Sequence, residues 1–133
     1  MADEKTRELD LLTERAIWCV IKVHQTLGPG FLEKIYRNAL LVELRKRGLS
    51  TDVERQVWIY YEGQKIGRHV LDLLVENKLI LEVKTAEALG KAHYAQVRSY
   101  LKATGLERAL LINFDGDRAD FRRVELSKWT PPR

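Results

Sequence analysis

The sequence predicts an α/β fold in which helices flank a mixed central β-sheet. Two observations carry this prediction. Apolar residues recur at helical spacing in three stretches of the chain. Runs of β-branched and aromatic residues, bounded by turn residues, lie between the second and third of these stretches and again after the third. The predicted order is therefore helix, helix, three strands, helix, strand and strand.

Capping and breaking residues bound the predicted helices. We expect Thr13 to cap the first helix, and Gly28, which is followed by proline, to end it. The second helix should run from about Phe31 to Arg47, with Gly48 directly beyond it. The third fits Leu89–Ala103, an amphipathic stretch that follows the first three strands.

Five segments have the composition and length of strands. Charged and glycine-containing turns separate them, and prolines are absent from them. They are Val53–Tyr61, Ile66–Val75, Leu79–Thr85, Ala109–Phe114 and Ala119–Leu126.

The length and composition suit one globular domain. The chain has 133 residues, of which 45% are hydrophobic and 32% charged. We expect a single domain over residues 1–133, with frayed termini at residues 1–11 and 127–133.

The charge and the cysteine content narrow the class of protein further. The formal net charge of +4 is compatible with a polyanionic partner. Cys19 is the only cysteine, so an internal disulfide is excluded and a reducing compartment is the default. The polar N-terminus does not resemble a signal peptide, and no window approaches the roughly 20 apolar residues of a membrane span. We therefore expect a cytoplasmic protein with no membrane partner.

The segment VLDLLVENKLILEVKT carries the most informative charged residues. Glu82 and Lys84 are two residues apart on one predicted strand, so both side chains point to the same face. A three-residue loop centred on Asn77 would place Asp72 of the preceding strand directly opposite Glu82, about 5 Å away between Cβ atoms. Two acids and a lysine would then converge on one face of the sheet.

Two interpretations fit this convergence. Neighbouring carboxylates repel, and a hard divalent cation such as Mg²⁺ would relieve the repulsion, while Lys84 could orient a water or stabilise charge on a phosphodiester. Alternatively, the charges belong to a solvated sheet face on which Lys84 forms a salt bridge. Apolar residues surround the charges on both strands, which favours a cleft.

Two motifs resemble those of known nucleases. Asp72 followed by Glu82-Val83-Lys84 resembles the signature of the PD-(D/E)xK nuclease superfamily, with Leu71 in place of the proline before the aspartate.

Gly30, Glu33 and Tyr36 resemble the defining motif of the small GxxExxY proteins. The likeness extends over about Leu12 to Val124. It implies a restriction-endonuclease-like, PD-(D/E)xK core with a mixed sheet flanked by helices.

The resemblance also implies a metal centre for Mg²⁺ or Mn²⁺. Its ligands would be Asp72, Glu82, the backbone carbonyl of Val83 and Glu33, and Lys84 would serve the nucleophile. Taken from the residues alone, Glu33 is equally a first-turn glutamate that the helix dipole favours.

Further candidates lie on the third helix. Gln96 and Tyr100 are four residues apart on one face and resemble the QxxxY motif that follows ExK in related exonuclease domains. A surface glutamine and a core-edge tyrosine would show the same spacing. Lys91, Arg98 and Lys102 form a basic stripe suited to phosphate contacts, or an ordinary solvated helix face.

Other aromatic and histidine residues are assigned to packing. His69 is three residues before Asp72, so strand alternation puts it on the opposite face, outside the site. Trp18, Trp58 and Trp129 are expected to pack rather than to stack on bases.

The sequence as a whole therefore predicts a metal-dependent nuclease that hydrolyses phosphodiester bonds, in DNA, with Mg²⁺ or Mn²⁺ as cofactor. A non-catalytic nucleic-acid-binding or accessory subunit that retains the fold is the main alternative, and a structural protein is the other. The chain could act as a homodimer or within a larger DNA-processing assembly.

Overall fold

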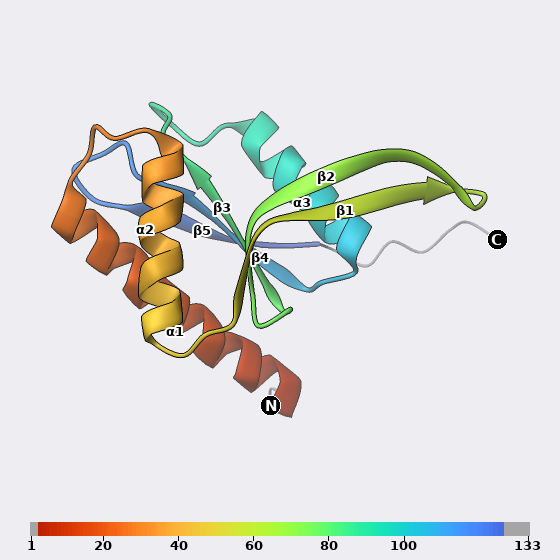
Figure 1. The fold of residues 1–133 in the computed structure, drawn as a ribbon, viewed down its shortest axis with the longest axis horizontal. Coiled ribbons are helices and arrows are strands. Elements are labelled where there is room, and N and C mark those ends of the chain that lie inside the picture. Colours follow the sequence, from red (N-terminus) through yellow and green to blue (C-terminus); the bar gives the residue numbers. More distant parts are fainter. Residues whose placement is uncertain (1–2, 127–133) are drawn as a thin grey trace.

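A five-stranded mixed sheet with helices on both faces forms the centre of the computed structural model, which describes residues 3–126 (Figure 1). The α/β architecture predicted from the sequence is therefore confirmed. The elements are α1 (Glu4–Leu27), α2 (Glu33–Lys46), β1 (Thr51–Tyr61), β2 (Gln64–Val75), β3 (Leu79–Lys84), α3 (Lys91–Thr104), β4 (Arg108–Asn113) and β5 (Asp120–Glu125).

The strands follow chain order across the sheet, β1-β2-β3-β4-β5. Every neighbouring pair is antiparallel except β3 and β4, which are parallel. Parallel neighbours need a crossover connection, and α3 supplies it.

Two apolar clusters fill the space between the sheet and the helices. On one face, α1 and α2 pack against alternate residues such as Leu81 of β3 and Ile112 of β4. On the other face, α3 packs against the intervening residues, among them Ile80 and Leu111. All residues of β4 are buried because helices cover the central strands on both sides. No helix within residues 3–126 combines the length and apolar character needed to cross a membrane.

Helix α1 begins earlier than predicted. Asp3 is its N-cap, and the Asp3 carboxylate accepts a hydrogen bond from the backbone N–H of Thr6 at 2.8 Å. Thr13 is a buried residue within the helix, where its hydroxyl donates to the carbonyl of Leu9 at 2.7 Å. The expectation that residues 4–11 are frayed is therefore wrong, whereas residues 127–133 lie outside the described part.

The β2–β3 hairpin has the predicted register. Leu73 pairs with Leu81 and Val75 with Leu79, as a three-residue loop requires. Within that loop, Glu76 and Asn77 adopt left-handed backbone conformations, with φ of 54° and 55°. The loop length therefore fixes which residues of the two strands lie opposite each other.

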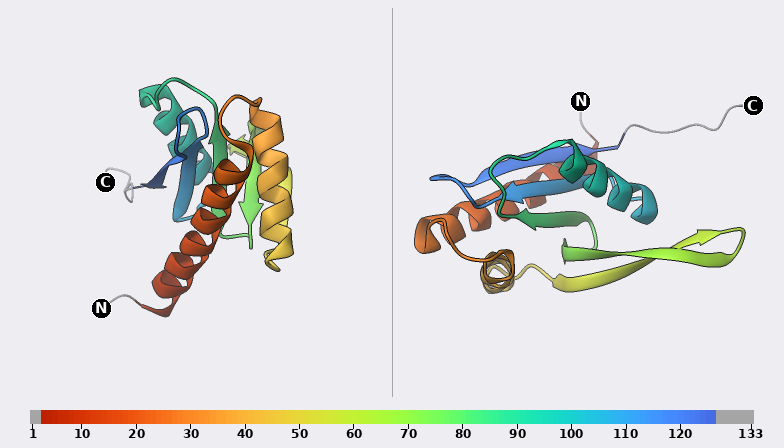
Figure 2. Two further views of the ribbon diagram at one scale, coloured as in Figure 1. Left: turned by 90° about the vertical axis from the view of Figure 1, so that its left-hand side faces the viewer. Right: turned by 90° about the horizontal axis from the view of Figure 1, so that it is seen from above.

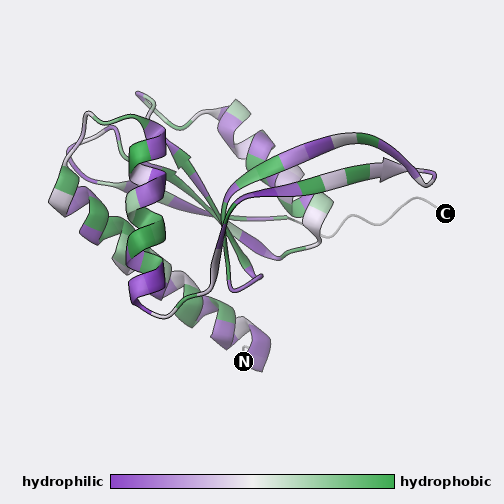
Figure 3. Cartoon of the chain, viewed as in Figure 1, coloured by the Kyte–Doolittle hydropathy of each residue, from purple (hydrophilic) through white to green (hydrophobic). Residues whose placement is uncertain are grey.

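The β1–β2 hairpin projects from the rest of the molecule as a two-stranded arm, residues 55–71 (Figures 1 and 2). Hydrophilic and hydrophobic bands are both present along it (Figure 3). Trp58 lies on this arm with 41% of its surface exposed, and Trp18 on α1 is 42% exposed, so neither is a packed core residue. Trp129 is outside the described residues.

Candidate active site

Asp72 lies where β2 separates from β3. Their pairing ends at Leu73, and the next contact is made by a side chain, since Asp72 Oδ2 accepts a hydrogen bond from the backbone N–H of Val83 at 2.8 Å. Leu71 packs in the cluster beneath α3, but Leu73 packs against α1 and α2, so the alternation of faces breaks at this point. Opposite Asp72, Glu54 of β1 has a left-handed backbone with φ of 52°, a conformation that costs a non-glycine residue about 1–3 kcal/mol.

Glu82 is the most strongly perturbed acid of the site. It is 4% exposed, and its Oε2 lies 3.3 Å from Lys84 Nζ. Its Oε1 is buried and has no hydrogen-bond partner among residues 3–126. Burial, and after it the charge of Asp72, raises the pKa of Glu82 to about 8. The positive charge of Lys84 acts in the opposite direction and lowers this pKa. The structure thus brings Asp72, Glu82 and Lys84 close together, but Asp72 and Glu82 are not the paired cross-strand neighbours that the sequence predicted, because the β2–β3 pairing ends at Leu73.

Tyr100 approaches Asp72 and Glu82, which we call the acidic pair, from α3. Tyr100 is 5% exposed, and burial, followed by the charges of Glu82 and Asp72, raises the pKa of its hydroxyl. His69 packs edge-on against Tyr100 with ring centroids 4.9 Å apart, and its Nε2 lies 2.7 Å from Ser99 Oγ. Alternation does turn His69 toward α3, but that side also carries Tyr100. His69 thus faces away from the pocket that Asp72 borders, as alternation predicted, and its place outside the site stays a prediction.

The other predicted residues of α3 are on its solvent side. Gln96 is exposed and makes no hydrogen bond with a described residue, so the structure does not join it to the acidic pair. Lys91, Arg98 and Lys102 are also exposed along this helix.

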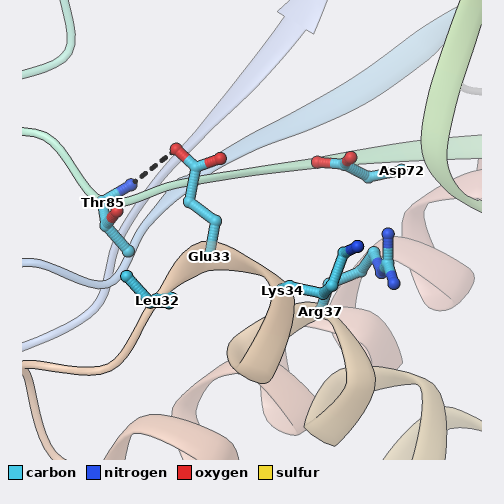
Figure 4. Close-up of a pocket in the computed structure, with 6 residues that line it drawn as sticks. All are labelled: Leu32, Glu33, Lys34, Arg37, Asp72 and Thr85. Carbon is cyan, nitrogen blue, oxygen red and sulfur yellow. Dashed lines mark hydrogen bonds between the residues drawn. The ribbon is translucent and has the colours of Figure 1, made fainter.

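A pocket opens between the first turn of α2 and the end of the β2–β3 pairing (Figure 4). Glu33 and Asp72 both border it, and Glu33 Oε1 accepts a hydrogen bond from the backbone N–H of Thr85 at 3.4 Å. Lys34 and Arg37 also line it. Neither was predicted from the sequence, although Arg37 is four residues from Glu33 and therefore on the same helix face. The Arg37 guanidinium is paired with Glu54 at 2.6 Å.

Glu33 does not complete a compact cluster with the acidic pair. Within residues 3–126, no three His, Cys, Asp or Glu side chains are placed so that they could hold a metal ion together. The predicted ligand set of Asp72, Glu82 and Glu33 is therefore not assembled in this conformation.

The loop before α2 is held by Tyr36. Its hydroxyl donates to the carbonyl of Gly28 at 2.5 Å and accepts from the N–H of Phe31 at 3.2 Å, while its ring stacks on Phe114 at 4.4 Å. Gly30 has a φ of 112°, which only glycine adopts readily. Two residues of the GxxExxY pattern thus fix the loop that leads to Glu33.

The acidic pair nevertheless has the donor chemistry of a divalent-cation site. Asp72 and Glu82 offer carboxylate oxygens, and the buried Glu82 Oε1 is an acceptor that nothing in the described protein satisfies. Hard cations such as Mg²⁺ take oxygen ligands and are held by one or two carboxylates together with water. Two protein carboxylates therefore suffice for this class of ion.

The sequence identifies the superfamily to which this site belongs. The pattern of the PD-(D/E)XK nuclease superfamily matches residues 10–124, so the chain belongs to that superfamily. Membership of the narrower GxxExxY group stays a prediction.

A solved structure supports the fold assignment. The structure titled "Crystal structure of SSO0001" superimposes with a TM-score of 0.57 at 18% sequence identity. The match covers 69% of this chain and 48% of that one, and it supports a restriction-endonuclease-like arrangement of the sheet and helices. No curated protein matches the sequence.

Proposed function

We propose that the protein is a nuclease that uses a divalent metal ion to hydrolyse phosphodiester bonds in DNA. The observation that carries this proposal is the Asp72–Glu82 pair, with the Lys84 ammonium 3.3 Å from Glu82. Asp72 also borders an open pocket lined by Lys34, whose ammonium could contact a phosphate held at a bound cation. Superfamily membership supports the same class of reaction.

Mg²⁺ or Mn²⁺ is the cofactor that these residues suit. Asp72, Glu82 and the backbone carbonyl of Val83 would hold it, and Glu33 would approach from α2. A bound ion supplies positive charge to the reacting phosphate and lowers the pKa of a coordinated water. Its charge would also favour ionised Glu82, whose pKa is raised to about 8 without metal.

The chain's own residues would orient the reaction. Lys84 is largely buried beside Glu82, so its ammonium has a fixed position from which it can orient a water or stabilise charge on phosphate oxygens. Tyr100 would position the acidic pair from α3, and Gln96, at the surface one turn away, would contact the substrate. The exposed Lys91, Arg98 and Lys102 would contact phosphates further along the strand.

The test is cleavage of a panel of single-stranded, duplex, flap and four-way-junction DNA in Mg²⁺ and in Mn²⁺, with a matching RNA set. We expect at least one DNA substrate to be cut, and chelation or Asp72→Asn to abolish the cutting. A protein that binds DNA but cuts no substrate with either metal would instead be the non-catalytic accessory subunit.

The phosphate-contact assignment needs a separate measurement, made in Ca²⁺, where binding can be followed without cleavage. Replacing Lys91, Arg98 and Lys102 together by alanine should weaken DNA binding. It should also flatten the salt dependence, by a slope of about 0.9 for each lost contact to duplex DNA. An unchanged slope would remove α3 from the phosphate-binding surface.

A further inference from the structure

One face of the arm, which we name the outer face, combines aromatic and basic residues. Cross-strand pairing sets Trp58 opposite Arg68, Tyr60 opposite Lys65 and Gln56 opposite Val70. A register shift between Ile59 and Tyr60 pairs Tyr60 with Lys65 of β2 instead of with Ile66. The opposite face of the arm carries His69, which contacts Ser99 and Tyr100 of α3. Trp58 and Tyr60 of the outer face also border a hollow that they share with Ser99 and Lys102 of α3.

The outer face leads to the candidate active site. Asp72 follows Val70 by two residues on β2, and it borders the pocket beside α2 rather than the cluster under α3. At about 3.3 Å per residue, Arg68 and the Trp58 opposite it lie about 13 Å from Asp72 along the strand. A ligand lying along the outer face would therefore run toward Asp72, the acid that borders this pocket.

Large apolar surfaces are open to solvent on this face. Trp58, Tyr60 and Val70 are 41%, 57% and 40% exposed. β2 pairs with β3 only at its last three residues, so most of the arm is supported by β1 and β2 alone. Exposed aromatic residues on a projecting element indicate a binding surface rather than core packing.

The positive charge on the outer face is not neutralised by neighbouring acids. Lys65 Nζ lies 4.3 Å from the centre of the Trp58 ring, and the Arg68 guanidinium lies 6.0 Å from it. Neither side chain has an acidic partner among residues 3–126. The sequence from Arg55 to Leu71 contains a single acidic residue, Glu62, which lies at the tip of the arm.

We infer that the outer face of the arm binds an unpaired nucleic-acid strand and directs it toward Asp72 and Glu82. Base faces can stack on Trp58 and Tyr60 only where they are unpaired, while Lys65 and Arg68 suit the phosphates between them. A duplex hides its base faces and would use the cations alone. The inference rests on the proposed nuclease function and adds that the substrate contains a single-stranded segment.

The experiment compares affinities for a fluorescent oligothymidylate and for a hairpin duplex, measured in Ca²⁺ without cutting. Trp58→Ala should weaken binding of the single strand by about fivefold to 100-fold, the range typical of one lost aromatic stack. Duplex binding should change much less. Trp58→Phe should retain most of the affinity because it keeps a stacking surface.

The chain offers matched controls for this variant. Trp18 is 42% exposed and has the Arg47 guanidinium 3.4 Å from its ring centre, but it lies on α1. Tyr61 is 64% exposed and alternates to the other side of the arm from Tyr60. Trp18→Ala and Tyr61→Ala should therefore bind the single strand as the wild type does.

Four results would overturn the inference. The first is that Trp58→Ala binds the single strand as tightly as the wild type, and the second is that it loses equal affinity for the single strand and the duplex. The third is that Trp18→Ala loses as much affinity for the single strand as Trp58→Ala does. The fourth is that the wild type sediments as a dimer and Trp58→Ala as a monomer. The last would assign the outer face to a second copy of the chain. Cleavage in Mg²⁺ separates this inference from the proposed function. A wild type that binds single strands through Trp58 but cuts nothing overturns the nuclease function and supports binding by the arm.

Discussion

Replacing Glu82 by glutamine should stabilise the metal-free protein at alkaline pH. Glu82 is 4% exposed, and one of its oxygens is buried with no hydrogen-bond partner in the part of the chain that the structure describes, so its ionised form is costly in the folded state. Glutamine has nearly the same shape and carries no charge. The variant therefore removes the electrostatic penalty and keeps the packing.

The size of the effect follows from the pKa of Glu82, which is raised from 4.5 to about 8 by burial and then by Asp72. Between these values the folded protein holds a proton that the unfolded chain has released, so the free energy of unfolding falls as the pH rises. The slope is about 1.4 kcal/mol per pH unit, and the total is at most about 5 kcal/mol at pH 8 and above. Below pH 4.5 the penalty is absent because both states are protonated.

Urea unfolding in the presence of a chelator, at intervals from pH 5 to pH 9, measures this contribution. The difference between Glu82→Gln and wild type should grow with pH and level off near the pKa of about 8. Glu107→Gln is the matched control, because Glu107 is an exposed glutamate near α3. Its unfolding free energy should follow that of the wild type.

A stability difference between Glu82→Gln and wild type that is constant across this pH range would refute the reasoning. It would mean that Glu82 has the same proton affinity in the folded and unfolded states. The acidic pair would then carry no electrostatic cost for a metal ion to relieve.

Three further predictions concern the site and its support. Asp72→Asn should leave the metal-free fold at least as stable as wild type and should lose the rise in Tm that Mg²⁺ or Mn²⁺ produces; an equal rise in both proteins would place the ion elsewhere. Lys84→Ala should lower single-turnover cleavage by about 100-fold or more, with little change of DNA affinity in Ca²⁺, and cleavage at the wild-type rate would contradict its role. Tyr36→Phe should lower the free energy of unfolding by about 0.5–1.5 kcal/mol, because the part-buried carbonyl of Gly28 and N–H of Phe31 lose their hydrogen bonds to the hydroxyl. An unchanged urea midpoint would show that this hydroxyl does not hold the loop.

The sequence was most informative where geometry depends on local rules. The three-residue loop around Asn77 determines the β2–β3 register, and side-chain alternation then places Glu82 and Lys84 together. Helices cover both faces of the two central strands, in agreement with the predicted mixed sheet flanked by helices.

Features that depend on distant contacts were not predictable in the same way. The capping signal at Thr13 was misleading because this hydroxyl is satisfied inside α1, and the buried Arg108 guanidinium also donates to it. The left-handed backbone of Glu54 has no sequence signal, since nothing local favours it in a glutamate. Its ion pair with Arg37 depends on how α2 lies against β1.

The two hairpins of the sheet would respond differently to changes in length. One residue added between Val75 and Leu79 would shift β3 against β2 and move Glu82 away from Asp72. Residues added at Glu62 and Gly63 would lengthen the free end of the arm and leave that pairing intact. Natural variation and engineered insertions should therefore be tolerated at the arm tip and excluded from the second turn, so the reach of the arm can change while the acidic pair stays constant.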